Sequence, residues 1–316
     1  MTEQELEKAL RTAAEADVAV IFAGLPEIFE SEGYDRTSMK LPQCQDRLIE
    51  EVLKVQPNVV VVLHNGSPVE LPWADKVSAI LEMYLGGQGV GEACDRLLFG
   101  EANPSGRLSE TFPYRLEDNP SFLHFPGNGK RVLYGEDIFV GYRYYDTKKV
   151  PVRYAFGHGL SYTEFTYGDL TLSSAQMTDE DILTVSFKVK NTGKTEGKEV
   201  VQLYVADMCG ISERPVKELK GFAKVHLLPG EEKTVSMEIS ARNLSYYEER
   251  LGDWYAPSGT YRILIGHASD DVRLHADIIF ETQKELPLCV DFTTTFGELL
   301  LSLIHISEPT RQAEIS

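Results

Sequence analysis

The chain has 316 residues, which is enough for two domains of ordinary size, each with its own hydrophobic core. Its apolar content of 42% and charged content of 25% are typical of a globular protein. Asp and Glu outnumber Lys and Arg by 49 to 31, a formal charge of −18, which argues against nucleic acid or an anionic membrane surface as partner and fits a protein that acts on a neutral ligand.

The sequence indicates neither membrane insertion nor export. No run approaches the roughly 18–20 apolar residues of a membrane span, and residues 1–16 have the pattern of a polar amphipathic helix instead of a signal peptide. The cysteines and histidines are scattered, without C-x-x-C or zinc spacing. We therefore expect a cytoplasmic protein without a metal site, whose cysteines are reduced thiols: Cys44, Cys94, Cys209 and Cys289.

The first half of the chain alternates between amphipathic helices and apolar strands. This pattern predicts parallel β-α-β units with a sheet between layers of helices. A first helix with Leu6 and Leu10 on one stripe is followed, in order, by a strand at 17–24, a helix at 45–55, strands at 58–66 and 78–87, and a helix at 89–100. We expect residues 141–145, GYRYY, to form a strand whose tyrosines contribute to a domain interface.

From Glu164 onward the sequence predicts short alternating strands divided by turn residues, and no clear helix. Such a run is typical of an antiparallel sandwich of the immunoglobulin or fibronectin type III kind. The expected strands lie within residues 183–193, 199–207, 217–231, 233–244, 259–267 and 272–281.

The α/β half lacks a strand before its first helix. Because a helix of a β-α-β path normally follows a strand, we expect Met1 to be an internal residue of a longer gene. At the other end, LSLIHISEPTRQAEIS resembles translated adapter DNA from sequencing libraries, a native tail being the alternative. We expect an incomplete α/β domain at 1–162, a sandwich at 163–298, and a non-native or disordered tail at 299–316.

An acidic segment, FESEGYDRTSMKLP, occupies residues 29–42 after the first predicted strand. Ligands of open α/β sheets bind beyond the carboxyl ends of strands, which is where the loop after Gly24 lies. Glu30, Glu32 and Asp35 fall close together in this loop. Carboxylates so close repel one another, so they indicate either a solvated loop or a site that uses their charge.

Two residues of this segment indicate how the loop is held. Gly33 permits a sharp turn of the backbone. Arg36 can form an ion pair with Asp35 or with Glu30, which would structure the loop and leave a carboxylate free. The residues alone do not choose between these pairings, and a solvated loop with an Asp–Arg pair is the alternative without chemistry.

Taken together, the motifs of the chain resemble those of family-3 glycoside hydrolases of the β-glucosidase type. The resemblance covers nearly all of residues 10–280, and so many motifs in one order make it specific. Its motifs are ESEGYDR (30–36) with LP (41–42), VVVVLHNG (59–66), LGGQG (85–89), LFGEANPSGRL (98–108), YGEDIFVGYRYYD (134–146), FGHGLSYT (156–163), NTG (191–193) and LKGF (219–222).

The resemblance implies a three-layer α/β sandwich domain followed by a fibronectin type III-like domain, in an enzyme that also has a (β/α)₈ barrel. It implies that Glu32, directly before Gly33, is the general acid/base of a retaining hydrolase, and that the nucleophilic aspartate lies in the barrel. Glu30 is the second candidate for the acid/base. The expected substrate is an oligosaccharide or β-glucoside with a terminal β-linked glucose, and no cofactor is expected.

The sequence departs from the family in one respect. We find no eight-fold β-α pattern for the barrel, so we expect the chain alone to be inactive, with the barrel encoded before or after it. The alternatives are a β-xylosidase or α-arabinofuranosidase of the same family, and a non-catalytic carbohydrate-binding module.

Aromatic and glycine-rich segments give further candidates. Phe29 and Tyr34 are candidates for substrate binding, Phe125 is a third for an aromatic platform, and we assign Trp73 to the core. The segment GGQGVG, residues 86–91, misses G-x-G-x-x-G and predicts close packing of a strand against a helix, not a nucleotide site.

Overall fold

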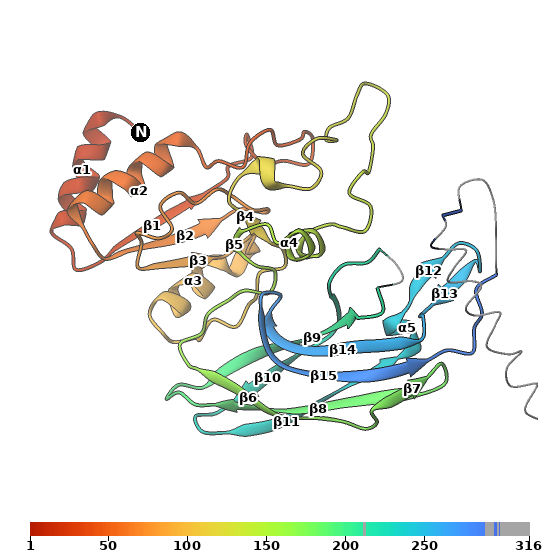
Figure 1. Ribbon diagram of the computed structural model, residues 1–316. Helices are drawn as coiled ribbons and strands as arrows, with labels where there is room; N and C mark the ends of the chain where they lie inside the picture. The colour runs from red at the N-terminus through yellow and green to blue at the C-terminus, as the bar shows by residue number, and fades with distance from the viewer. Residues whose placement is uncertain (211–212, 288–293, 296, 298–316) are drawn as a thin grey trace, which may run out of the picture.

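The computed structural model describes residues 1–210, 213–287, 294, 295 and 297, and it contains an α/β domain followed by a β-sandwich (Figure 1). The expected tail at 299–316 and Cys289 lie outside the described residues. In the α/β domain the elements are α1 (Glu3–Ala14), β1 (Ala19–Gly24), α2 (Gln43–Val55), β2 (Val59–His64), β3 (Ala79–Glu82), η1 (Gly87–Gly89), α3 (Val90–Leu98), β4 (Phe112–Pro113), η2 (Leu116–Asp118), α4 (Tyr142–Lys148) and β5 (Val152–Tyr154).

The sheet of this domain is parallel, in the order β1-β2-β3, as the sequence predicts. Thr2 and Glu5 form a capping box at the start of α1, which satisfies backbone donors that the first turn leaves free. Ile49 and Val52 of α2 are buried with Val59 and Val61 of β2, so α2 covers the central strand. Figure 1 shows α1 and α2 on one side of the sheet and α3 on the other, a three-layer arrangement.

Strand β1 differs from the buried strand that its apolar sequence predicts. Ile21 and Ala23 are buried in the core, whereas Val20 and Phe22 are 42% and 60% exposed. The strand forms one edge of the sheet, and the helices α1 and α2 cover only one of its faces. An apolar run therefore does not by itself establish that both faces are covered.

The tyrosine-rich segment at 141–145 forms the start of helix α4, so the expected strand is wrong. Tyr142 and Tyr145 are three residues apart, and this spacing puts both side chains on one face of a helix. Tyr145 is buried, and Tyr142 accepts a hydrogen bond from the backbone N–H of Leu219 in the sandwich at 2.7 Å. The expected interface role is confirmed for Tyr142.

The second domain is a sandwich of a five-stranded sheet, order β10-β9-β14-β15-β7, and a three-stranded sheet, order β11-β8-β6. Neighbouring strands in these two sheets are antiparallel, except that β15 pairs with β7 in parallel. The structure adds short elements to the expected strands. The bounds are β6 (Phe165–Leu172), β7 (Gln176–Thr178), β8 (Ile182–Asn191), β9 (Gly197–Asp207), β10 (Glu218–Leu227), β11 (Glu232–Ser240), α5 (Ala241–Leu244), β12 (Tyr246–Glu248), β13 (Asp253–Tyr255), β14 (Gly259–Ala268) and β15 (Asp271–Glu281).

The core of the sandwich follows the alternation of its strands. Leu183, Val185 and Phe187 of β8 are buried at every second position, and Val201 and Leu203 of β9 face them from the other sheet. Side chains of a strand alternate between its two faces, so this period of two places one row in the core and the other in solvent. The predicted fold class, α/β followed by all-β, is confirmed.

A buried polar network joins the two domains. Glu199, on β9, has no exposed surface, and its carboxylate accepts hydrogen bonds from Arg107 of the α/β domain at 2.5 Å and from Tyr167 at 2.6 Å. His267 places one ring nitrogen 2.6 Å from Glu199 and the other 2.8 Å from the carbonyl oxygen of Gly159. Both imidazole nitrogens therefore lie within hydrogen-bond distance of an oxygen, one in each domain.

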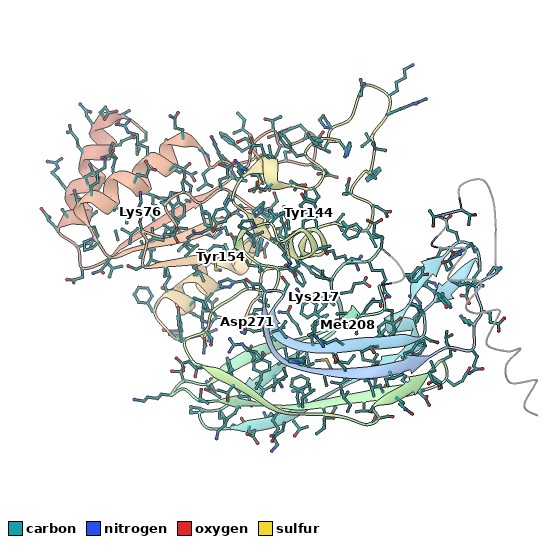
Figure 2. All side chains as sticks on the ribbon, viewed as in Figure 1. Lys76, Tyr144, Tyr154, Met208, Lys217 and Asp271 are labelled. Atoms are coloured by element: carbon teal, nitrogen blue, oxygen red, sulfur yellow. The ribbon has the colours of Figure 1, made fainter. Side chains whose placement is uncertain are left out.

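A second junction lies between α4 and the start of β10. Arg143 forms an ion pair with Glu218 at 3.2 Å, and Lys217 forms one with Asp146 at 2.7 Å. Figure 2 shows Lys217 between α4 and the strands of the sandwich. With the Glu199 network, these contacts fix the sandwich against the α/β domain at two separate places.

The Glu199 network gives a stability prediction. The substitution Arg107→Met keeps much of the apolar stem but leaves a buried carboxylate without its main cation, which costs about 3–5 kcal/mol. We expect a loss of this order in urea unfolding at pH 7. The matched control is Arg262→Met, which breaks an exposed pair with Asp277 on β14 and β15 and costs less than about 1 kcal/mol.

The pH dependence provides a second readout of the same pair. Burial alone would raise the pKa of Glu199, but the hydrogen bond from His267 and the charge of Arg107 outweigh it, so the pKa is lowered below 4.5. A lowered pKa contributes stability at higher pH that is lost as the pH falls through the folded value. The difference between wild type and Arg107→Met should therefore shrink in acid; equal losses for the two variants at pH 7 would contradict the network.

Candidate active site

The three parallel strands end at one edge of the sheet, and the loops after β1 and β2 meet there (Figure 1). The backbones of the two strands approach closely at this edge. A Cβ atom on Gly24 would lie 2.1 Å from the carbonyl oxygen of His64, so only glycine fits at the end of β1. Gln45 of α2 forms two hydrogen bonds of 2.9 Å with the backbone of Gly24 and fixes the start of the acidic loop.

Glu30 is bound to the loop after β2. Its carboxylate accepts hydrogen bonds from the backbone N–H of Gly66 at 2.7 Å and from the hydroxyl of Ser67 at 2.6 Å. A Cβ atom on Gly66 would lie 3.2 Å from this carboxylate, which explains the glycine in the segment HNGSP. Glu30 is therefore occupied by protein donors, and the structure favours a structural role for it.

Arg36 completes this arrangement. Its guanidinium lies 3.6 Å from the Glu30 carboxylate and donates hydrogen bonds to Ser67 and to the carbonyl oxygen of Pro68, at 2.5 and 3.3 Å. The sequence left two partners open for Arg36, and the structure pairs it with Glu30. We call the set Glu30, Arg36, Gly66 and Ser67 the loop clasp; it ties the acidic loop to the neighbouring loop on both sides of residues 31–35.

Glu32 lies at the tip of a tight turn between Glu30 and Arg36, the two clasp residues of the acidic loop. Ser31 and Tyr34 form an isolated antiparallel bridge, which leaves Glu32 and Gly33 as the two central residues of the turn. Glu32 is exposed, and within the described part of the chain its carboxylate makes no hydrogen bond or ion pair. A Cβ atom on Gly33 would meet no atom within 4 Å. The turn thus presents one free carboxyl group on a fixed base.

The other predicted loop residues lie near this turn. Phe29 and Tyr34 are 44% and 47% exposed, and the Tyr34 hydroxyl donates a hydrogen bond to the carbonyl oxygen of Glu27 across the loop. Asp35 is exposed and has no side-chain partner among the residues described, so its structuring role stays a prediction, whereas Arg36 holds the loop. Substrate binding by Phe29 and Tyr34 is equally a prediction.

Two half-buried carboxyl groups, those of Glu82 and Glu110, lie close enough to the acidic loop to feel the charge of Glu30, and the sequence analysis missed both. Glu82, at the end of β3, accepts hydrogen bonds from the backbone of Tyr84 at 2.8 Å and from the Asn65 side chain at 3.3 Å. Burial raises the pKa of Glu82 to about 7. Burial, followed by the charge of Glu30, also raises the pKa of Glu110. The sequence did contain a signal for Glu82. This carboxylate is the last residue of the third parallel strand, and the carboxyl end of that strand lies beside the loops that follow β1 and β2.

The remaining candidates are structural. Trp73 is fully buried and donates a hydrogen bond to Asp46 at 2.9 Å, which confirms its assignment to the core. A Cβ atom on Gly86 would lie 2.4 Å from the Val90 side chain, so the glycine-rich segment permits close packing at the start of α3. Among the described residues, no group of three or more His, Cys, Asp or Glu side chains could hold a metal ion, and no helix is long and apolar enough to cross a membrane.

Comparison with known families gives two matches. The glycosyl hydrolase family 3 C-terminal domain matches residues 2–162, and a fibronectin type III-like domain matches residues 199–269. Thermostable beta-glucosidase B of Acetivibrio thermocellus is 55% identical to the chain over 276 residues, which cover 87% of this chain and 37% of that protein. The chain thus spans little more than a third of the length of this relative.

Solved structures agree with the fold. The family 3 beta-glucosidase of Bifidobacterium adolescentis superimposes with a TM-score of 0.88 at 39% identity, covering 94% of this chain and 44% of that one. The beta-glucosidase of Kluyveromyces marxianus in complex with glucose superimposes with a TM-score of 0.84 at 42% identity, covering 88% of this chain and 33% of that one.

The loop clasp yields a prediction about local order. In a Glu30→Ala variant, Gly66, Ser67 and Arg36 lose a shared charged acceptor, so we expect a loss of about 2 kcal/mol in urea unfolding and faster amide hydrogen exchange across residues 25–40. The matched control is Glu32→Ala, two residues away at a side chain with no partner in the described ranges, which should stay within about 0.5 kcal/mol of wild type. The same exchange rates in both variants would show that the clasp does not hold the loop.

Glu82 yields a prediction about pH. Because its folded pKa of about 7 exceeds the ordinary 4.5, the folded state holds the proton more tightly, and its stability falls as the pH rises from 4.5 to 7. Glu82→Gln removes this ionisation, so its stability relative to wild type should rise across that range by on the order of a few kcal/mol. Chemical unfolding at pH 5 and pH 8 measures this. If the free energies of unfolding of the two proteins change in parallel with pH, Glu82 does not have the raised pKa that the prediction requires.

Proposed function

The chain belongs to glycosyl hydrolase family 3, and from that membership we propose that it is the part of a retaining β-glucosidase that carries the general acid/base, Glu32. The observation that supports this role most directly is the contrast between Glu30 and Glu32, the two candidates for the acid/base. Glu30 is held by three donors, while Glu32 projects from the turn and has no partner in the part of the chain that the structure describes. A proton donor must reach a substrate oxygen, and of the two candidates Glu32 is the one whose carboxyl group is not already bound by the protein.

The proposed reaction is hydrolysis of a terminal, non-reducing β-linked glucose with retention of configuration. Retaining hydrolysis uses two carboxyl groups about 5–5.5 Å apart, one as acid/base and one as nucleophile. Glu32 protonates the oxygen of the leaving group as the nucleophile attacks the sugar, and it then deprotonates the water that hydrolyses the glycosyl-enzyme. The nucleophile is proposed to lie on a (β/α)₈ barrel outside this chain, encoded before or after it.

Phe29 and Tyr34 are proposed to contact the sugar beside Glu32. Both rings are about half exposed on the acidic loop, and an aromatic face suits the C–H groups of a pyranose. We propose glucose as the preferred sugar because the relatives named above are beta-glucosidases. A β-xylosidase or α-arabinofuranosidase, or a binding module without catalysis, is the alternative function. A cytoplasmic location stays a proposal from the sequence.

A chimera tests the proposal. The chain replaces the matching segment of the Acetivibrio thermocellus enzyme, to which it is 55% identical. We expect hydrolysis of aryl β-glucosides by the chimera and none above buffer by the isolated chain. Glu32→Gln in the chimera should lower kcat/KM by about 10²–10⁴-fold, the usual contribution of a general acid/base.

The matched control is Glu27→Gln, which changes another exposed glutamate of the same loop whose side chain has no partner among the described residues. It should retain activity within about threefold of the unmodified chimera, since it removes no group assigned to the reaction. An active Glu32→Gln chimera would contradict the assignment. Activity of the isolated chain would contradict the need for a second domain.

A further inference from the structure

The dipeptide Asn-Gly occurs twice in the chain, as Asn65-Gly66 and as Asn128-Gly129. Asparagine is chemically labile, and a glycine after it has no side chain to hinder its backbone nitrogen from attacking the asparagine side chain. The other asparagines are followed by proline, which has no backbone N–H to lose, or by a larger residue: Asn58, Asn103, Asn119, Asn191 and Asn243. The surroundings of the two Asn-Gly pairs decide which of them reacts.

The structure holds Asn65-Gly66 in a form that opposes this reaction. Asn65 has no exposed surface, and its side-chain nitrogen donates hydrogen bonds to the carbonyl oxygen of Ser67 at 3.0 Å and to Glu82 at 3.3 Å. The backbone N–H of Gly66 donates to the Glu30 carboxylate at 2.7 Å. Loss of that proton would place a negative nitrogen beside a negative carboxylate, which costs electrostatic energy. Both reacting groups of this pair are therefore bound within the fold.

The second pair lies in an exposed turn. The chain between η2 and α4 forms a long loop that extends away from the rest of the α/β domain (Figure 1). Within this loop Asn128 and Arg131 form an antiparallel bridge with backbone hydrogen bonds of 2.8 and 3.3 Å, so Gly129 and Lys130 are the central residues of a tight turn. Gly129 has a φ of +62°, which favours glycine at the first central position. All four residues are exposed.

Neither reacting group of this turn is held by the protein. Within the described part of the chain, the Asn128 side chain and the backbone N–H of Gly129 make no hydrogen bond. A Cβ atom on Gly129 would meet no atom within 4 Å, so the approach to its nitrogen is open. The charged residues next to it in the turn are Lys130 and Arg131, whose positive charge favours the anion that forms when Gly129 loses its amide proton.

We propose that Asn128 is a site of spontaneous deamidation, and that the fold protects Asn65 from the same reaction. The deprotonated backbone nitrogen of Gly129 bonds to the side-chain carbonyl carbon of Asn128. The bond from that carbon to the side-chain nitrogen breaks, and the nitrogen takes up a proton and leaves as ammonia. Water then opens the cyclic imide at either carbonyl group. The product is aspartate, or isoaspartate, in which the main chain runs through the former side chain.

The modification changes the turn in two ways. Either product adds a negative charge beside Lys130 and Arg131. Isoaspartate also lengthens the main chain by one methylene group, which does not fit the two-residue turn closed by the bridge between Asn128 and Arg131. The reaction needs no substrate, so it is independent of the proposed function.

The test follows both asparagines of the 316-residue chain by mass spectrometry of peptides after incubation in mildly alkaline buffer, once folded and once unfolded in guanidinium chloride. Unfolded, the two pairs have the same local chemistry, so their rates should agree within about threefold. Folded, Asn128 should react within about tenfold of its unfolded rate, whereas Asn65 should be slowed about a hundredfold or more, because it must wait for local opening. Equal rates at the two positions in the folded chain, or equal slowing of both by folding, would overturn the proposal.

Variants separate the chemistry from the fold. Asn128→Gln should abolish the product in the turn, because the longer side chain would have to close a larger ring; undiminished product there would overturn the assignment. Glu30→Ala frees the Gly66 N–H, so it should raise the folded-state rate at Asn65 about tenfold and still leave it below the unfolded rate. Glu32→Ala is the matched control and should leave that rate unchanged. An unchanged rate at Asn65 in Glu30→Ala would contradict protection by the loop clasp.

Discussion

The Glu30 carboxylate is the contact on which the acidic loop depends. A run of three acidic residues in a short loop is repulsive unless some of the charge is neutralised. Here the backbone N–H of Gly66, the hydroxyl of Ser67 and the guanidinium of Arg36 surround Glu30, and they link the loop after β1 to the loop after β2. Glu30 therefore has a structural role, and the turn beyond it presents Glu32, whose carboxyl group has no partner among the described residues.

Charged side chains elsewhere in the described structure follow the same division between paired and unpaired groups. Buried charges in the described structure are paired where they join parts of the fold, as Glu199 is with Arg107 and His267 between the two domains. The exposed carboxyl group of Glu32, where substrate is proposed to bind, has no partner among the described residues. This contrast separates the charges that hold the fold together from the carboxyl group that is proposed to act on substrate.

The sequence predicted the order of the elements well, because period and turn chemistry are local properties. The alternation in β8 and β9 and the apolar β2 specified strands correctly. Burial of β1 was overestimated, since an apolar strand does not show how many helices cover it. The segment at 141–145 begins a helix because tyrosines at 142, 144 and 145 fit a helical period as well as a period of two, and the helix places Tyr145 in the interior and Tyr142 against Leu219.

For the site, the sequence identified the loop and its candidate acid, but it could not choose between Asp35 and Glu30 as the partner of Arg36. That choice depends on Gly66 and Ser67, which lie more than thirty residues away and are brought close only by the parallel pairing of β1 with β2. Which side chains pair across two loops depends on the tertiary fold, so local sequence patterns do not predict it.

The most direct test of the account is chemical rescue of the Glu32→Gln chimera by azide. If Glu32 is the acid/base, the variant forms the glycosyl-enzyme from an activated aryl glucoside, and azide, which needs no general base, should release it as β-glucosyl azide at a restored rate. Glu30→Gln should form no such product. Failure of azide to rescue Glu32→Gln, or rescue of Glu30→Gln instead, would contradict the assignment of the proton donor to the free carboxyl group of the turn.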